Sequence, residues 1–175
     1  MTPLKKQILW IAVVVLIVVT VDQTTKALVR AYSPIEKYIV IGPEPQFFRI
    51  SHQENPGVVG GIFRENKVLA HAAPLLAVLV LLYLFRQLEP TSKLQLTAYG
   101  MIWGGAIGNN LLDRLRLGVV TDFLQFHFYF IPFDFPWKMY PAFNVADINI
   151  CCGVFLLIVG WMWIGQKQER VSDTA

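Results

Sequence analysis

The sequence predicts an all-α membrane protein with four transmembrane helices and a small β-sheet outside the membrane. Of its 175 residues, 55% are hydrophobic and only 15% are charged, and the mean hydropathy is +0.49. A soluble domain carries more polar residues than this. The hydrophobic residues also cluster into runs long enough to cross about 30 Å of hydrocarbon. The length fits a single domain.

Four hydrophobic runs supply the spans, which lie at about residues 8–28, 68–85, 94–112 and 145–165. Lys5 and Lys6 precede the first run, as in a secretory signal peptide, but no small-residue cleavage site follows it. We therefore expect the first run to be a retained span. In the third run Gly100, Gly104 and Gly108 recur every four residues, a spacing that predicts close packing of helix backbones in lipid.

The charges of the connecting segments predict the orientation. An even number of spans puts both termini on the same side of the membrane. The short segments on that side are dense in lysine and arginine, whereas the two long loops opposite balance their basic residues with acids. By the positive-inside rule we expect both termini in the cytoplasm, with residues 29–67 and 113–144 on the outer side.

The two outer segments differ in character. In the first, the β-rich runs Tyr38–Ile41 and Phe47–Ile50 and the glycine-rich run Gly57–Phe63 are separated by turn residues, which predicts a small sheet over about residues 38–63. The second is crowded with aromatic residues over about residues 123–140. We expect this stretch to rest at the lipid interface.

Ionisable and amide side chains gather at the outer ends of the spans. An ionisable side chain within a span costs free energy, so each one needs a structural or functional explanation. Asp22 and Lys26 are four residues apart and share one face of the first span. They are either a mutually neutralised pair or part of a functional site. At the end of the third span Asn110, Asp113 and Arg114 share another face, and we expect Asp113 and Arg114 to form an ion pair that anchors the helix end.

Two further aspartates follow at the same level. Asp122 is a lone carboxylate among apolar neighbours, without a basic residue close to it in sequence. Asn144 and Asp147 open the fourth span with the spacing of a capping box. A capping role and a catalytic role for Asp147 are compatible, since the N-terminus of a helix stabilises a carboxylate.

This convergence favours an active site. Two carboxylates that face each other in a partly dry site share a proton. One can act as a base on water while the protonated one polarises a carbonyl, which is the chemistry of peptide-bond hydrolysis. We expect no cofactor and no metal, because His52, His71 and His127 lack metal-ligand spacing. The scattered basic residues do not indicate nucleic-acid binding.

Two other functions remain open from the residues alone. The chain could be a non-enzymatic four-helix scaffold in which the aspartates are caps and anchors. It could also be a lipid-handling or transport protein that uses the polar level as a binding site.

Several blocks of the sequence resemble the bacterial lipoprotein signal peptidases, the signal peptidase II family. After Val21–Lys26, these blocks are residues 47–57, 104–114, 118–123 and 141–147. The resemblance implies an aspartic endopeptidase of the bacterial inner membrane, with an extracytoplasmic β-cradle at about residues 38–63. Its substrates would be prolipoproteins whose cysteine carries diacylglycerol, cut just before that cysteine to release the signal peptide. Membrane lipid would be its other partner, and we expect a monomer.

The resemblance also implies roles for individual residues. The family's catalytic aspartates fall on Asp122 and Asp147. Its supporting residues fall on Asp22, Lys26, Asn55, Gly57, Asn110, Arg114 and Asn144. Here Gly108 is followed by two asparagines where the family usually has one. Asn110 keeps the helical spacing to Asp113 and is assigned the role, with Asn109 as the alternative. The aromatic stretch after Phe123 would cover the groove where lipid and the signal helix enter.

Overall fold

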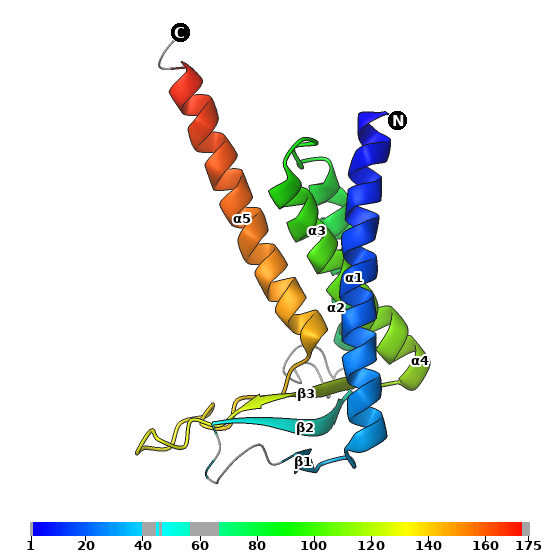
Figure 1. Cartoon of the computed structure of the whole chain (residues 1–175), viewed down its shortest axis with the longest axis vertical. Helices are drawn as coiled ribbons and strands as arrows, with labels where there is room; N and C mark the ends of the chain where they lie inside the picture. Colours follow the sequence, from blue (N-terminus) through cyan, green and yellow to red (C-terminus); the bar gives the residue numbers. More distant parts are fainter. Residues whose placement is uncertain (1, 40–44, 46, 57–66, 173–175) are drawn as a thin grey trace.

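The computed structural model describes residues 2–39, 45, 47–56 and 67–172. Long helices run side by side, and a small sheet lies across one end of them (Figure 1). The start of α1 and the end of the last helix both lie at the opposite end, well apart from each other. Gly57 and the predicted run Gly57–Phe63 fall outside the described residues.

Helices stand at each of the four predicted spans. They are α1 (Pro3–Tyr32), α2 (Lys67–Phe85), α3 (Lys93–Ala106) and α5 (Val145–Ser172). By length and composition, α1 and the Val145–Trp163 part of α5 can each cross a membrane, with mean hydropathies of 2.2 and 2.0. The chain is a helical membrane protein with a small sheet.

The predicted span at 94–112 is not one α-helix. Helix α3 passes directly into a π-helix, η2 (Ile107–Arg114), and then into one turn of α-helix, α4 (Leu115–Leu117). Gly118 ends this turn in the left-handed region at φ 80°, where glycine meets no steric penalty. The π-helix changes which side chains share a face, and this has consequences at the site.

The glycines of α3 bring three helices into close contact. Gly100 and Gly104 face α1, where a Cβ on Gly104 would lie 2.6 Å from Cβ of Val18. Gly105 faces α5, where a Cβ would lie 2.5 Å from the carbonyl oxygen of Ala146. Only glycine fits at such distances. The close packing predicted from the glycine spacing is therefore confirmed.

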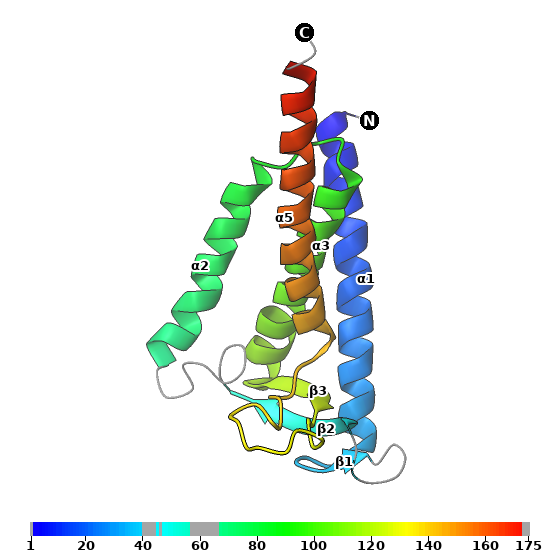
Figure 2. The same cartoon turned by 90° about the vertical axis from the view of Figure 1, so that its left-hand side faces the viewer.

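Helix α2 stands apart from the other three. Near its end it is tied to α3, where the buried Tyr99 hydroxyl donates a hydrogen bond of 2.8 Å to the carbonyl oxygen of Leu81. From there α2 diverges from α3 and α5 toward the sheet (Figure 2). The separation between α2 and the other helices therefore increases toward the sheet.

The sheet combines both outer segments. Strands β1 (Tyr38–Ile39), β2 (Phe48–Asn55) and β3 (Val120–Phe126) are antiparallel in that order. The sheet expected at about residues 38–63 therefore gains a strand from the second segment. The sequence interpretation missed β3 because the same run is rich in aromatic residues, which resemble an interfacial loop.

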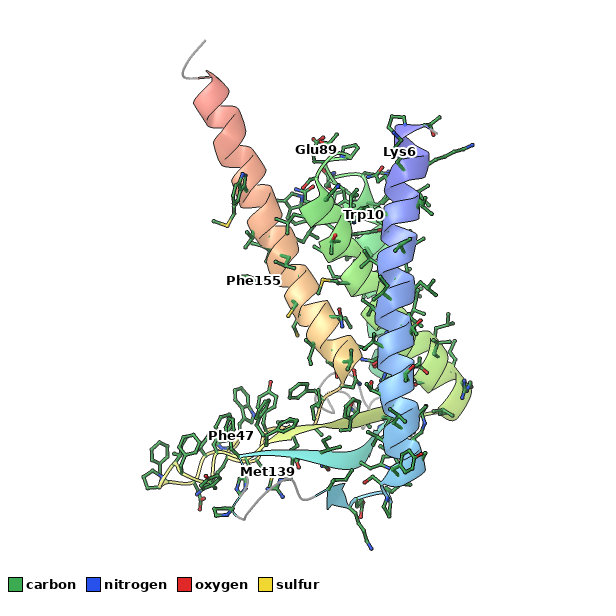
Figure 3. The ribbon with its side chains drawn as sticks, in the orientation of Figure 1. Lys6, Trp10, Phe47, Glu89, Met139 and Phe155 are labelled. Carbon is green, nitrogen blue, oxygen red and sulfur yellow. The ribbon has the colours of Figure 1, made fainter. Side chains whose placement is uncertain are left out.

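Aromatic rings continue beyond the paired strands as a lobe, which we call the aromatic lobe (Phe47 and residues 126–140). Phe47 contacts Phe126, Phe128 and Phe130, with ring centroids 5.1, 5.6 and 5.9 Å apart. Figure 3 shows Phe47 and Met139 in this lobe, away from the helices. Several of its side chains are exposed, among them Tyr129, Phe130, Phe133 and Trp137.

Candidate active site

Asp147 occupies the first turn of α5 and forms a capping box with Asn144. The Asp147 backbone N–H donates to Asn144 Oδ1 at 3.0 Å, and the Asn144 N–H donates back to Asp147 Oδ2 at 3.1 Å. The predicted capping geometry is confirmed. It holds the Asp147 side chain at the helix N-terminus, where the helix dipole favours a negative charge.

Asp122 lies on β3 and is held by two amides. It pairs with Gln53 of β2, so Asn55, two residues further along, is its diagonal neighbour on the same face. Asn55 Nδ2 donates to Asp122 Oδ2 at 3.0 Å, and Asn144 Nδ2 donates to Asp122 Oδ1 at 2.7 Å. Because Asn144 contacts both Asp122 and Asp147, the two carboxylates are neighbours.

Asn109 links this pair to the interior of the helices. Its Nδ2 donates to Asp147 Oδ1 at 2.8 Å, while its Oδ1 accepts from Asn144 Nδ2 at 3.1 Å and from Lys26 Nζ at 2.7 Å. The side chain of Asn110 instead donates to the carbonyl oxygen of Ala106 on its own helix at 3.1 Å. Of the two asparagines considered, Asn109 is therefore the one that contacts Asp147, while Asn110 as the site asparagine stays a prediction. That prediction assumed α-helical spacing, and the segment is a π-helix.

A second pair of carboxylates lies at the same level, but it is closed off. Lys26 Nζ forms ion pairs of 2.9 Å with both Asp22 and Asp113, and all three side chains are fully buried. Gln23 Nε2 donates to Asp22 and to Asp113 at 3.0 Å each. The predicted Asp22–Lys26 pair is confirmed. Arg30, 4.0 Å from Asp113, supplies a second positive charge, so two cations balance the two carboxylates, as buried charges require.

Asp113 therefore has a different partner from the one predicted. Its ion pairs are with Lys26 and, at 4.0 Å, with Arg30, rather than with Arg114. Adjacent helical side chains point in different directions, so Asp113 turns into the core while Arg114 turns toward a cavity.

The Asp22 carboxylate also holds α5 in place. Asp22 Oδ1 accepts a hydrogen bond of 2.9 Å from the backbone N–H of Ala146, which has no partner within its own helix turn. A Cβ on Gly108 would lie 2.5 Å from Asp22 Oδ2, so only glycine leaves room for this carboxylate. The buried ion pair thus sets the position of the helix end that carries Asp147.

The carboxylates of Asp122 and Asp147 differ from the buried pair in their partners. In the described part of the chain, their oxygens accept hydrogen bonds from amides, and neither forms an ion pair. Burial, and next the nearby charge of Asp147, raise the pKa of Asp122 to about 7, although hydrogen bonds from Asn55 and Asn144 oppose the shift. Asp122 thus holds a proton over a pH range in which an ordinary aspartate has lost it.

Two apolar cavities reach this level. The first, about 700 Å³, has Asp122 and Asp147 at its polar end and continues between α2, α3 and α5 as far as Trp161. The second, about 490 Å³, lies between α2 and the α3–η2 segment. Asn110 and Arg114 line both cavities. The acidic pair lines the first cavity, and the second cavity lies next to it.

The structure brings together most of the residues singled out in the sequence. Asp22, Lys26, Asn55, Asp122, Asn144 and Asp147 form one network, and Asn110 and Arg114 line the cavities beside it. Sequence reasoning missed the network roles of Gln23 and Thr121, whereas it named Asn109 as the alternative to Asn110 and expected an ion pair at Asp113. The buried Thr121 accepts a hydrogen bond of 2.9 Å from Arg30. The position of Thr121 next to Asp122 in the sequence could have indicated that Thr121 belongs to the network.

The fold and the site define a helical membrane protein with an acidic pair at the polar end of an apolar cavity, an arrangement that suits a membrane enzyme. A family model described as signal peptidase (SPase) II matches residues 14–163. A lipoprotein signal peptidase of Symbiobacterium thermophilum is 36% identical, over 89% of this chain and 95% of that protein. One of Syntrophotalea carbinolica is 39% identical, over 83% and 86%.

Solved structures agree with these relatives. A bacterial membrane enzyme superposes with a TM-score of 0.69 at 25% identity, covering 87% of each chain. A second superposes with a TM-score of 0.67 at 26% identity, covering 86% of this chain and 91% of the other. The chain belongs to the signal peptidase II family. It is therefore a protease and a bacterial inner membrane protein.

Proposed function

We propose that this protein is an aspartic endopeptidase that removes the signal peptide from diacylglyceryl-modified prolipoproteins, cutting just before the lipidated cysteine. The observation that carries this function is the position of Asp122 and Asp147, side by side at the polar end of an apolar cavity. A peptide bond at the end of an apolar helix would meet both carboxylates there.

The chemistry follows from one proton shared by the two carboxylates. The ionised aspartate takes a proton from water as the water oxygen bonds to the scissile carbonyl carbon, while the protonated aspartate donates to the carbonyl oxygen. The tetrahedral intermediate then collapses, the carbon–nitrogen bond breaks, and the amino group of the cysteine leaves with a proton. The products are a free carboxyl on the signal peptide and a free amine on the lipoprotein. The raised pKa of Asp122 supports this sharing near neutral pH.

The two cavities support a substrate with two apolar parts. They share the lining residues Ala77, Leu81, Ala106, Asn110 and Arg114 and otherwise follow different sides of α2. In a lipidated precursor, an apolar signal helix and a diacylglyceryl group both extend from the region of the cleavage site. A soluble peptide would need neither cavity.

The same function orients the protein in the membrane. We place α1, α2, α3 and α5 across the bilayer with both termini in the cytoplasm, so that the sheet and the acidic site lie at the outer face. The exposed rings of the aromatic lobe then lie at the lipid interface, where aromatic side chains are favoured. One chain supplies the whole acidic network, which is consistent with a monomer.

The test uses Asp122→Asn and Asp147→Asn, with Asp134→Asn as the control because Asp134 is 96% exposed. The purified variants are mixed in vesicles with a lipidated precursor, and cleavage is followed by gel mobility. Both site variants should lose cleavage while their melting temperatures stay close to that of the parent. Asp134→Asn should cleave normally, and an unlipidated precursor should be ignored. Full cleavage by either site variant would refute the proposal.

A further inference from the structure

The apolar cavity has a definite length. Asp147 and Trp161 both line it, and they lie fourteen residues apart on the continuous helix α5. At about 1.5 Å per residue, the cavity runs about 21 Å from the acidic pair to Trp161. Among the described residues that line it, the charged and amide side chains lie at the Asp147 end, so the rest of its length suits an apolar occupant.

The far end of the cavity is closed by packed side chains. Trp161 and Leu84 are half-buried and pack against a core that includes the buried residues Leu81, Leu88 and Leu157. Leu88 belongs to the short connection that returns the chain from α2 to α3. Figure 2 shows α2 nearer to α3 and α5 at this end than beside the sheet, so a straight helix that runs along α5 meets Trp161 and Leu84 there.

We infer that Trp161, with Leu84, sets the length of apolar helix that the enzyme accepts, and that this length separates signal peptides from membrane anchors. A helix of about 14 residues fills about 21 Å. Signal peptides have apolar segments of roughly 7–15 residues, whereas a stable transmembrane helix needs about 20. The longer helix meets the Trp161 indole before its end reaches the acidic pair. This assignment rests on the proposed function and adds a specificity-determining residue to it.

Small side chains that line the cavity favour a helix over an acyl chain as the occupant. Ala106 of α3 lines the cavity one turn from Asn109, and Ala77 of α2 lines it near its middle. Small residues let the backbone of a second helix approach closely. The scissile bond also has to reach Asp122 and Asp147, and the peptide on its N-terminal side is the signal helix.

The experiment compares lipidated precursors with apolar segments of about 12 and about 20 residues. The parent enzyme should favour the short segment in kcat/KM by roughly tenfold or more, the range by which apolar sites discriminate. Trp161→Ala should lower the ratio of kcat/KM for the short segment to kcat/KM for the long segment by about tenfold. Trp161→Phe should leave most of this ratio in place. The control is Trp163→Ala, because Trp163 is 71% exposed, and it should leave the ratio unchanged.

A second variant shortens the cavity instead of lengthening it. Val154 lines the cavity midway, and Val154→Trp should impair cleavage of the 12-residue precursor more than that of one about 7 residues long. An unchanged length ratio in Trp161→Ala, or equal cleavage of both lengths by the parent, would overturn the inference while leaving the peptidase function intact. A response to acyl length instead of helix length would also overturn it. Failure of the parent to cleave any lipidated precursor would refute the proposed function itself.

Discussion

Removal of the Lys26 charge should destabilise the protein strongly. The Lys26 ammonium lies 2.9 Å from both Asp22 and Asp113, and none of the three side chains is exposed. The variant Lys26→Met keeps most of the aliphatic stem but leaves two buried carboxylates without their cation. Breaking a buried ion pair in this way costs about 3–5 kcal/mol. At about 2–4 °C for each kcal/mol in a chain of this size, the melting temperature should fall by about 6–20 °C.

The molecule contains a matched control for this variant. Lys138 and Asp134 are also four residues apart, with a similar separation of 3.0 Å, but this pair lies at the surface. Lys138→Met should leave the melting temperature nearly unchanged, since exposed ion pairs contribute little. Thermal unfolding of the purified variants in detergent measures both. A shift for Lys26→Met no larger than that for Lys138→Met would refute the reasoning.

Three further outcomes are expected from the site and its connections. Cleavage should decline above about pH 7 as Asp122 loses its proton. Asn55→Ala should move this decline to higher pH, because it removes a hydrogen bond that lowers the pKa of Asp122. Profiles of kcat/KM against pH measure both effects. Asn109→Ala should reduce kcat much more than Asn110→Ala, and steady-state kinetics of the pair would contradict the geometry if the order were reversed. Gly118→Ala should cost about 1–2 kcal/mol of stability from backbone strain alone, since a Cβ there meets no neighbour, and Gly118→Asn should melt closer to the parent.

The positions of the helices and of most site residues could be predicted from the sequence. Long apolar runs require helices in a membrane, because every backbone polar group must be paired within its own segment. The four-residue spacing of Asp22 and Lys26 predicted a contact that the structure confirms. Glycine spacing in α3 predicted close helix packing for a similar reason. These features depend only on the repeat of a regular helix.

Features that depart from the regular repeat could not be predicted in this way. A π-helix widens the turn, and this shift makes Asn109 rather than Asn110 the residue that contacts Asp147. The strand containing Asp122 pairs with a strand more than sixty residues earlier in the chain. Such pairing has no local signal in the sequence. The aromatic residues of the same segment pointed instead to an interfacial loop.

The two acidic pairs depend on each other through Lys26. An ammonium has three N–H donors and no acceptor. Two of them pair with Asp22 and Asp113, and the third donates to Asn109 Oδ1 at 2.7 Å. With its oxygen held by this cation, Asn109 can only present its NH₂ group to Asp147. The buried, neutralised pair thus fixes the direction of a hydrogen bond at the reactive pair. A regular packing core of apolar residues could stabilise the helices equally well, but it could not orient that amide.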